Sequence, residues 1–249
     1  MNQIIVLWST CHSQSTAFER IMLERGDLHV FHEPFGKYFY FSKERGVQRA
    51  EHIKPKPEYD FEYIINTVLN KAEKEPIFMK EQAFQAGRKI TTDILKQFSN
   101  SFLLRHPKEV IPSMHHKMPD FTLEELGYEA LHTLFEKSCQ LTDKNAIVVD
   151  SSDFIANPKA TIQAYCHALG IPFIADALSW DARLPEQFVW WDGGSWLDDV
   201  AKSTSIQPTN KSYTKIEESE FLQQAYEHAM PYYNELLQHK LDIKPFISI

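Results

Sequence analysis

Five short apolar runs alternate with amphipathic segments along the first two thirds of this chain. The runs cover residues 4–8, 28–33, 76–80, 101–105 and 146–150. Mainly apolar runs of this length between polar segments predict buried strands. Segments with the apolar spacing of helices follow them at residues 61–72, 93–98, 123–141 and 158–169. This alternation predicts a three-layer α/β/α domain, in which helices cover both faces of a central parallel sheet.

Several residues mark the ends of the predicted helices. Pro107 suits the first turn of a helix after the fourth strand. Thr122 and Glu125 have the spacing of a capping box at the start of segment 123–141, which we expect to be one helix. Gly170 and Pro172 end the helix at 158–169.

We expect residues 1–249 to form a single domain, because this length suits one large α/β domain and is short for two. Residues 43–60, rich in Lys, Glu, Pro and His, predict a surface insertion or lid. Residues 180–213 predict a closing loop, and residues 217–238 an amphipathic C-terminal helix. The proposed closing loop contains Trp180, Trp190, Trp191 and Trp196. Of these, Trp180 is expected in the core.

Composition narrows the function classes. A formal net charge of −8 disfavours a broad nucleic-acid surface but allows a small basic pocket. The cysteines, Cys11, Cys139 and Cys166, are odd in number and widely spaced, which disfavours a disulfide framework or a zinc cluster. No apolar stretch reaches the length of a membrane span, and no signal peptide is evident. We therefore expect a cytoplasmic protein without membrane insertion, and a homodimer stays open.

Each predicted strand ends at a polar residue. These residues are Ser9, Glu33, Lys80, Arg105 and Asp150. Parallel α/β sheets bind ligands at the carboxyl ends of their strands. We therefore expect this edge of the sheet to hold the functional site.

The segment 9–16 follows the first strand and leads into a helix that contains Phe18. A strand, a loop of small polar residues and a helix form an anion site, because backbone N–H groups and the helix N-terminus converge on the ligand. A Walker A loop starting at Ser9 would need Gly there and Gly-Lys-Ser/Thr at residues 14–16. The chain has Gln-Ser-Thr at 14–16, so an ordinary ATPase or GTPase is disfavoured.

Residues 11–17, Cys-His-Ser-Gln-Ser-Thr-Ala, resemble the 5′-phosphosulfate loop of the P-loop sulfotransferases. That loop has a basic residue, Ser, a variable position, two Ser/Thr residues and an apolar residue. His12 stands where the family usually has Lys or Arg, which weakens the positive charge unless the imidazole is protonated. A capped strand-to-helix turn is the alternative interpretation of this loop.

A second resemblance lies at residues 103–113, which are similar to the 3′-phosphate motif of the same family. Arg105 follows an apolar strand, a Pro and an acidic residue come next, and Ser113 stands eight positions after the Arg. An Arg offers a planar fork to a phosphate and a Ser adds a hydroxyl donor. A lone Arg at a strand end would more often form a structural ion pair.

Three further segments extend the resemblance over residues 3–205. They are Phe-His-Glu-Pro-Phe at 31–35, Phe-Met-Lys-Glu at 78–81, and the stretch from 148 through Asn157-Pro158 to Gly-Ile-Pro at 170–172. The resemblance implies the P-loop sulfotransferase fold and the donor 3′-phosphoadenosine 5′-phosphosulfate (PAPS), with adenosine 3′,5′-bisphosphate as product. It implies transfer to a small-molecule acceptor, foremost a hydroxyl and secondarily an amine, without a metal.

The resemblance also implies roles for individual residues. The donor-binding set is His12, Ser13, Gln14, Ser15, Thr16, Ala17, Arg105, Ser113 and Lys202. Within this set, Arg105 and Ser113 would hold the 3′-phosphate, and Lys202 stands in the region where relatives close the donor site. Lys80 would contact the transferred sulfuryl group.

The acceptor's proton needs a base. Glu33 is our first choice, from its strand end, and His32 is the alternative. Strand alternation puts these two side chains on opposite faces unless the strand has already ended. Gln82 stands where small-molecule members have a catalytic His. His12 could replace the usual basic residue, act as an acid on the leaving phosphate, or fill the turn.

Three other functions stay open. A P-loop kinase of related fold lacks support because the Walker lysine is missing. A degenerate member could bind a nucleotide without turnover, which His12 and Gln82 favour. A non-enzymatic interaction protein would leave the polar strand ends unexplained. A Cys-phosphatase loop starting at Cys11 would need an Arg at position 17, which is Ala.

Overall fold

Five parallel strands form the sheet, in the order β2-β3-β1-β4-β5. They are β1 (Ile4–Ser9), β2 (His29–His32), β3 (Ile77–Gln82), β4 (Ser99–Leu104) and β5 (Ile147–Asp150). The computed structural model describes residues 2–141, 146–188, 197–208 and 213–247. All five predicted strands are confirmed, with ends displaced by one or two residues.

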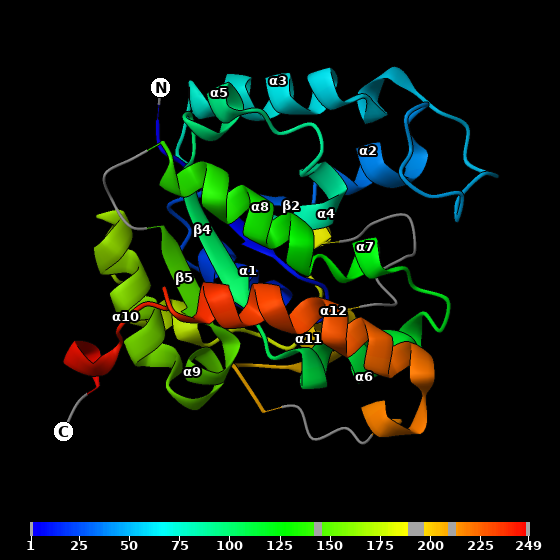
Figure 1. Ribbon diagram of the computed structural model, residues 1–249. Coiled ribbons are helices and arrows are strands. Elements are labelled where there is room, and N and C mark those ends of the chain that lie inside the picture. Colours follow the sequence, from blue (N-terminus) through cyan, green and yellow to red (C-terminus); the bar gives the residue numbers. More distant parts are fainter. Residues whose placement is uncertain (1, 142–145, 189–196, 209–212, 248–249) are drawn as a thin grey trace.

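Alternation along the central strand β1 divides the core between the two faces of the sheet. Ile4, Val6 and Trp8 pack on one face with α3 (Phe61–Ala72), α8 (Tyr128–Cys139) and α12 (Glu220–Leu237). Ile5 and Leu7 pack on the other face with α1 (Ser15–Glu24) and α10 (Pro158–Leu169). Figure 1 shows α8 and α12 in front of the strands and α1 behind them. The three-layer α/β/α architecture is therefore confirmed.

Shorter helices connect these layers. They are α2 (Gly36–Phe41), α4 (Ala83–Ala86), α5 (Thr92–Leu95), α6 (Pro107–Lys117), α7 (Leu123–Leu126), α9 (Ser151–Ala156) and α11 (Asp198–Lys202). The C-terminal helix starts later than predicted, because Ser219 caps it and residues 216–218 form a 3₁₀ turn.

The prediction of one helix over 123–141 is wrong. Gly127 adopts φ +82° and separates α7 from α8, whereas the capping box of Thr122 and Glu125 is confirmed. A side chain at Gly127 would be strained by this backbone conformation, and its Cβ would lie 3.7 Å from the Cα of Thr10. The break therefore lets α7 and the loop after β1 approach closely.

The segment 43–60 lies on the surface as turns and a short 3₁₀ helix. Arg49 fastens it to α7, with Nε 2.7 Å from Glu125 and a further ion pair to Asp120. Trp180 is buried as expected, and its Nε1 donates to Ser203. Trp190, Trp191 and Trp196 of the predicted closing loop lie outside the described residues. None of the helices in the described ranges is long and apolar enough to cross a lipid bilayer.

Candidate active site

A cavity of about 660 Å³ opens at the carboxyl ends of the strands. Its wall includes most of the residues that the sequence singled out: His12, Ser13, Gln14, Ser15, Thr16, Ala17, His32, Glu33, Arg105, Ser113 and Lys202. The described lining does not include Ser9, Lys80 or Asp150. The structure therefore gathers separate motifs of the sequence into one site, whereas three strand-end residues lie outside its described lining.

Two of the polar residues at the strand ends, Ser9 and Asp150, form hydrogen bonds within the fold. Ser9 is fully buried and donates to the carbonyl of Glu81 on the neighbouring strand. Asp150 caps α9 by accepting from the N–H of Ser152 at 2.9 Å. Both side chains stabilise local structure at the edge of the sheet where we expected the site.

The loop between β1 and α1 has the backbone of an anion-binding turn. His12 and Gln14 adopt positive φ angles of 52° and 69°. The loop is held from outside, because Ser151 Oγ donates to the carbonyl of Ser13 at 2.5 Å and Arg105 Nη1 donates to that of His12 at 2.7 Å. Helix α1 starts immediately afterwards at Ser15. Its first N–H groups lack intrahelical partners and can bind an anion at the cavity wall.

His12 joins the two predicted phosphate motifs. Its Nδ1 lies 2.9 Å from Ser113 Oγ, and its carbonyl accepts from Arg105. Tyr213 approaches the same Ser113 hydroxyl at 3.4 Å. Arg105 is also paired with Glu109, so its guanidinium is fixed in place between α6 and the loop. The structure thereby brings Arg105, Ser113 and the 11–17 loop into direct contact.

A second depression of about 890 Å³ adjoins the first and shares Arg105 and Ser113 with it. Lys108 and Lys215 line this second depression. Sequence reasoning missed both, because isolated lysines on surface segments give no distinguishing pattern. The charged lining of this depression is mixed, because Glu109 and Glu217 also belong to it.

Lys80 lies beneath the cavity wall. Its side chain is fully buried on the face of the sheet that α1 covers, where it forms an ion pair with Glu33 and lies 3.7 Å from Glu19. Burial alone would lower the pKa of Lys80, but the carboxylates of Glu33 and Glu19 outweigh burial and raise this pKa. Lys80 is therefore a permanent cation that compensates one of the two negative charges of Glu33 and Glu19.

Glu33 lies between Lys80 and the cavity. β2 ends at His32, and Glu33 adopts φ +42°, which explains how both neighbouring side chains reach the cavity wall despite strand alternation. Gln82 and Gln85 also donate to its carboxylate, at 3.1 and 3.4 Å. Burial alone would raise the pKa of Glu33, but the Lys80 charge outweighs it and lowers this pKa to about 2. Such a carboxylate is a weak proton acceptor.

His32 is held by a residue that the sequence analysis did not single out. Glu19 on α1 is fully buried, and its Oε2 lies 2.8 Å from His32 Nδ1. The His32 ring stacks on Phe188 with centroids 4.9 Å apart. The sequence offered one signal for Glu19: it is an acidic residue among the apolar positions of the helix that follows the loop.

The remaining described wall of the cavity is mainly neutral. It includes Tyr40, Gln82, Gln85, Met114 and Met118. Arg49 also lines it, but Glu125 and Asp120 engage its guanidinium. Of the aromatic residues at 35–41, Tyr40 lines the cavity, whereas Phe35 and Phe39 are in the core.

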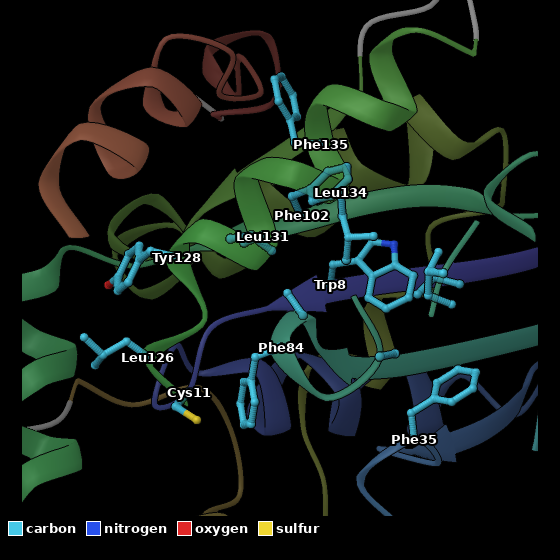
Figure 2. Close-up of a cluster of buried hydrophobic side chains, with 14 of the residues drawn as sticks. Trp8, Cys11, Phe35, Phe84, Phe102, Leu126, Tyr128, Leu131, Leu134 and Phe135 are labelled. Carbon is cyan, nitrogen blue, oxygen red and sulfur yellow. The ribbon is translucent and has the colours of Figure 1, made fainter. Parts of the chain in front are cut away.

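Cys11 also lines the cavity, but its thiol is buried and donates to Gln82. It belongs to the hydrophobic cluster on one face of the sheet, and Figure 2 shows it beside Phe84 and Leu126. Burial, and then the charge of Glu33, raise the pKa of the Cys11 thiol well above its usual range. A nucleophilic thiolate at this position is therefore disfavoured.

We expect the three cysteines to differ in reactivity. Cys139 is exposed, whereas Cys11 and Cys166 are buried and burial raises the pKa of both thiols. Iodoacetamide labelling of the native protein, followed by peptide mass spectrometry, should modify Cys139 at least about tenfold faster, because the thiolate is the reactive form. Equal labelling of Cys11 would contradict its burial.

The sheet order, the loop after β1 and the cavity at the strand ends define an α/β domain with an anion-binding loop. Comparison of sequences then identifies the family. A profile of the sulfotransferase domain matches residues 3–239, so this chain belongs to the sulfotransferase domain family.

Two solved structures have the same fold. The sulfotransferase domain from the curacin biosynthetic pathway is 14% identical, with a TM-score of 0.50 over 97% of this chain and 99% of that one. The sulfotransferase domain from the Synechococcus PCC 7002 olefin synthase is 15% identical, with a TM-score of 0.54 over 93% and 94%. At these identities the likeness concerns the fold alone.

Two curated relatives from Arabidopsis thaliana are longer proteins. They are named branched-chain-amino-acid aminotransferase-like proteins 2 and 1, and each is 28% identical to this chain. The matches cover 84% and 95% of this chain but 37% and 42% of those proteins. This chain therefore spans about two fifths of their length, and their names describe the longer proteins.

Proposed function

We propose that this protein transfers a sulfuryl group from PAPS to a hydroxyl of a small molecule. The observation that carries the proposal is the contact of His12 with both Arg105 and Ser113, which brings the loop proposed for the 5′-phosphosulfate next to the pair proposed for the 3′-phosphate. The two motifs are far apart in the sequence, and their juxtaposition matches the two anionic groups of one nucleotide donor.

The residues present suit that donor. Backbone N–H groups at the start of α1 and the hydroxyls of Ser15 and Thr16 supply neutral donors for the 5′-phosphosulfate, whereas the Ser13 hydroxyl donates to the carbonyl of Thr10. Arg105, whose Nε and Nη1 already donate to Glu109 and to the His12 carbonyl, supplies positive charge for the 3′-phosphate, and Ser113 supplies a hydroxyl. Lys202 lines the same cavity, on α11, and adds a second positive charge. None of these interactions requires a metal ion.

Lys80 contributes charge from beneath the wall. Without its ammonium, Glu33 and Glu19 would place two buried negative charges next to the site of an anionic donor. With it, one of these two negative charges is compensated, which lowers the electrostatic repulsion of an anionic donor. Sulfuryl transfer, like phosphoryl transfer, then depends mainly on positioning and on electrostatic stabilisation by such preorganised groups.

The acceptor would bind against the neutral wall. Tyr40, Met114 and Met118 offer apolar surface, and Gln82 and Gln85 offer amide groups next to Glu33. Methionine side chains adapt to different shapes, so this wall suits an uncharged alcohol with an apolar body. The end of β2 supplies two groups that could accept the hydroxyl proton, Glu33 and His32.

Calorimetric titration tests the donor site. We expect adenosine 3′,5′-bisphosphate to bind with at least about tenfold higher affinity than ATP with Mg²⁺, because ATP lacks a 3′-phosphate for Arg105 and Ser113. Preferential binding of ATP with Mg²⁺ would contradict the proposal and favour a kinase. Binding of the bisphosphate without sulfuryl transfer to any alcohol would indicate a member without turnover.

A further inference from the structure

One buried carboxylate has no part in the donor site. Glu19 lies in the first half of α1, is fully buried, and contacts His32 and Lys80. Its other carboxylate oxygen, Oε1, has no hydrogen-bond partner among the described residues. Burying an ionised carboxylate is costly unless nearby positive charge compensates it. The position therefore has a stability cost that packing alone does not explain.

The register of the sheet explains why Glu19 meets these two residues. His32 on β2 pairs with Lys80 on β3, so both side chains lie next to each other on the same face. Helix α1 packs on that face, and its Glu19 Oε2 reaches the imidazole at 2.8 Å and the ammonium at 3.7 Å. Phe188 stacks on the imidazole and fixes the plane of the ring.

We propose that Glu19 is a positioning residue for a catalytic His32. This assignment rests on the proposed sulfuryl transfer. A carboxylate at Nδ1 keeps the hydrogen on that nitrogen, so the lone pair of the neutral ring lies on Nε2. His32 forms part of the cavity wall. Enzymes that activate a hydroxyl group often use a base whose orientation is fixed by a further side chain.

The proton transfer balances. The acceptor hydroxyl forms a bond to sulfur while the bond between sulfur and the phosphate oxygen breaks. The hydroxyl proton moves to His32 Nε2, and adenosine 3′,5′-bisphosphate leaves with the electron pair. The resulting imidazolium is stabilised by Glu19, whose Oε2 is within hydrogen-bond distance of Nδ1. The imidazolium then returns its proton to water.

Glu33 is less suited to this step. Its carboxylate accepts from Lys80, Gln82 and Gln85. Three donors stabilise the ionised form and make it a weak base. Glu33 instead keeps Lys80 in place. The neighbouring Glu81 carries little charge, because burial and the charge of Glu33 raise the pKa of Glu81 well above its usual range. The contacts therefore favour His32 over our first choice from the sequence.

Long-range ¹H–¹⁵N NMR of the histidine rings tests the assignment without an acceptor. His32→Gln identifies the resonances of His32. We expect the neutral ring in the wild type to carry its hydrogen on Nδ1. In Glu19→Met, which removes the partner of Nδ1, this preference should be lost. A hydrogen on Nε2 in the wild type, or an unchanged tautomer in Glu19→Met, would overturn the proposal.

Kinetics give a second readout. The assay uses an alcohol acceptor found by screening. Glu19→Gln should lower kcat about a hundredfold or more, which is the scale of general-base catalysis. The affinity for adenosine 3′,5′-bisphosphate should change less than about twofold. The matched control is Glu24→Gln on the same helix, which pairs with Arg20 and should leave kcat unchanged. Equal kcat values for Glu19→Gln and the wild type would overturn the role of Glu19.

The two failures can be told apart. If the wild type does not bind the bisphosphate, the proposed function fails, whatever the tautomer of His32. If it binds the bisphosphate and transfers sulfuryl groups, but Glu33→Gln lowers kcat about a hundredfold and His32→Gln does not, then Glu33 is the base and the proposal for Glu19 fails.

Discussion

Replacement of Lys80 by Met is expected to lower the free energy of unfolding by about 3–5 kcal/mol, the scale for removing one partner of a buried ion pair. Lys80 is fully buried between Glu33 and Glu19, so its loss leaves two carboxylates without their cation. Met fills a similar volume, which limits the contribution of an empty space. Urea unfolding followed by circular dichroism measures the change.

Lys89→Met is the matched control for the Lys80 variant. Lys89 pairs with Glu44 at 2.6 Å, but both side chains are exposed, so the free energy of unfolding should change little. The double variant Lys80→Met/Glu33→Gln should be less destabilised than the two single variants together, because one unpaired carboxylate is removed. Equal stability of Lys80→Met and Lys89→Met would show that the buried pair does not stabilise the fold.

The strands of the sheet, and the edge of the sheet that holds the candidate site, could be predicted from local sequence. Buried parallel strands are short apolar runs, and their polar ends mark the functional edge, as Glu33 and Arg105 show. The break at Gly127 could not be predicted in this way. Residues 123–141 keep helical spacing on both sides of it, and the contacts of Gly127 with Phe84 and Thr10 are long-range.

The parts of the site that depend on short sequence motifs could be predicted. The parts that depend on which helix packs on which strand could not. The loop 11–17 and the pair of Arg105 and Ser113 were found from spacing. The roles of Lys80 and Glu19 depend on which face of β3 meets α1, which no local pattern specifies. Lys80 was expected at the sulfuryl group, whereas the structure places it behind Glu33.

Replacement of Arg105 by Ala is expected to weaken the binding of adenosine 3′,5′-bisphosphate by about 1.5–3 kcal/mol, the scale of a hydrogen bond to a charged group. This corresponds to a loss of about ten- to a hundredfold in affinity. The guanidinium lines the cavity next to Ser113 and is held in place by Glu109. Calorimetric titration of wild type and variant under identical salt conditions measures the loss.

Two comparisons separate phosphate binding from support of the loop, because Arg105 also donates to the carbonyl of His12. Arg105→Lys keeps the charge but not the planar fork, so its affinity should fall between those of wild type and Arg105→Ala. Adenosine 5′-monophosphate, which lacks the 3′-phosphate, should bind wild type and Arg105→Ala nearly equally. Arg88→Ala, at an exposed pair with Glu124, should bind the bisphosphate like the wild type. If Arg105→Ala weakens both nucleotides by the same factor, Arg105 acts through the loop, and the 3′-phosphate belongs elsewhere.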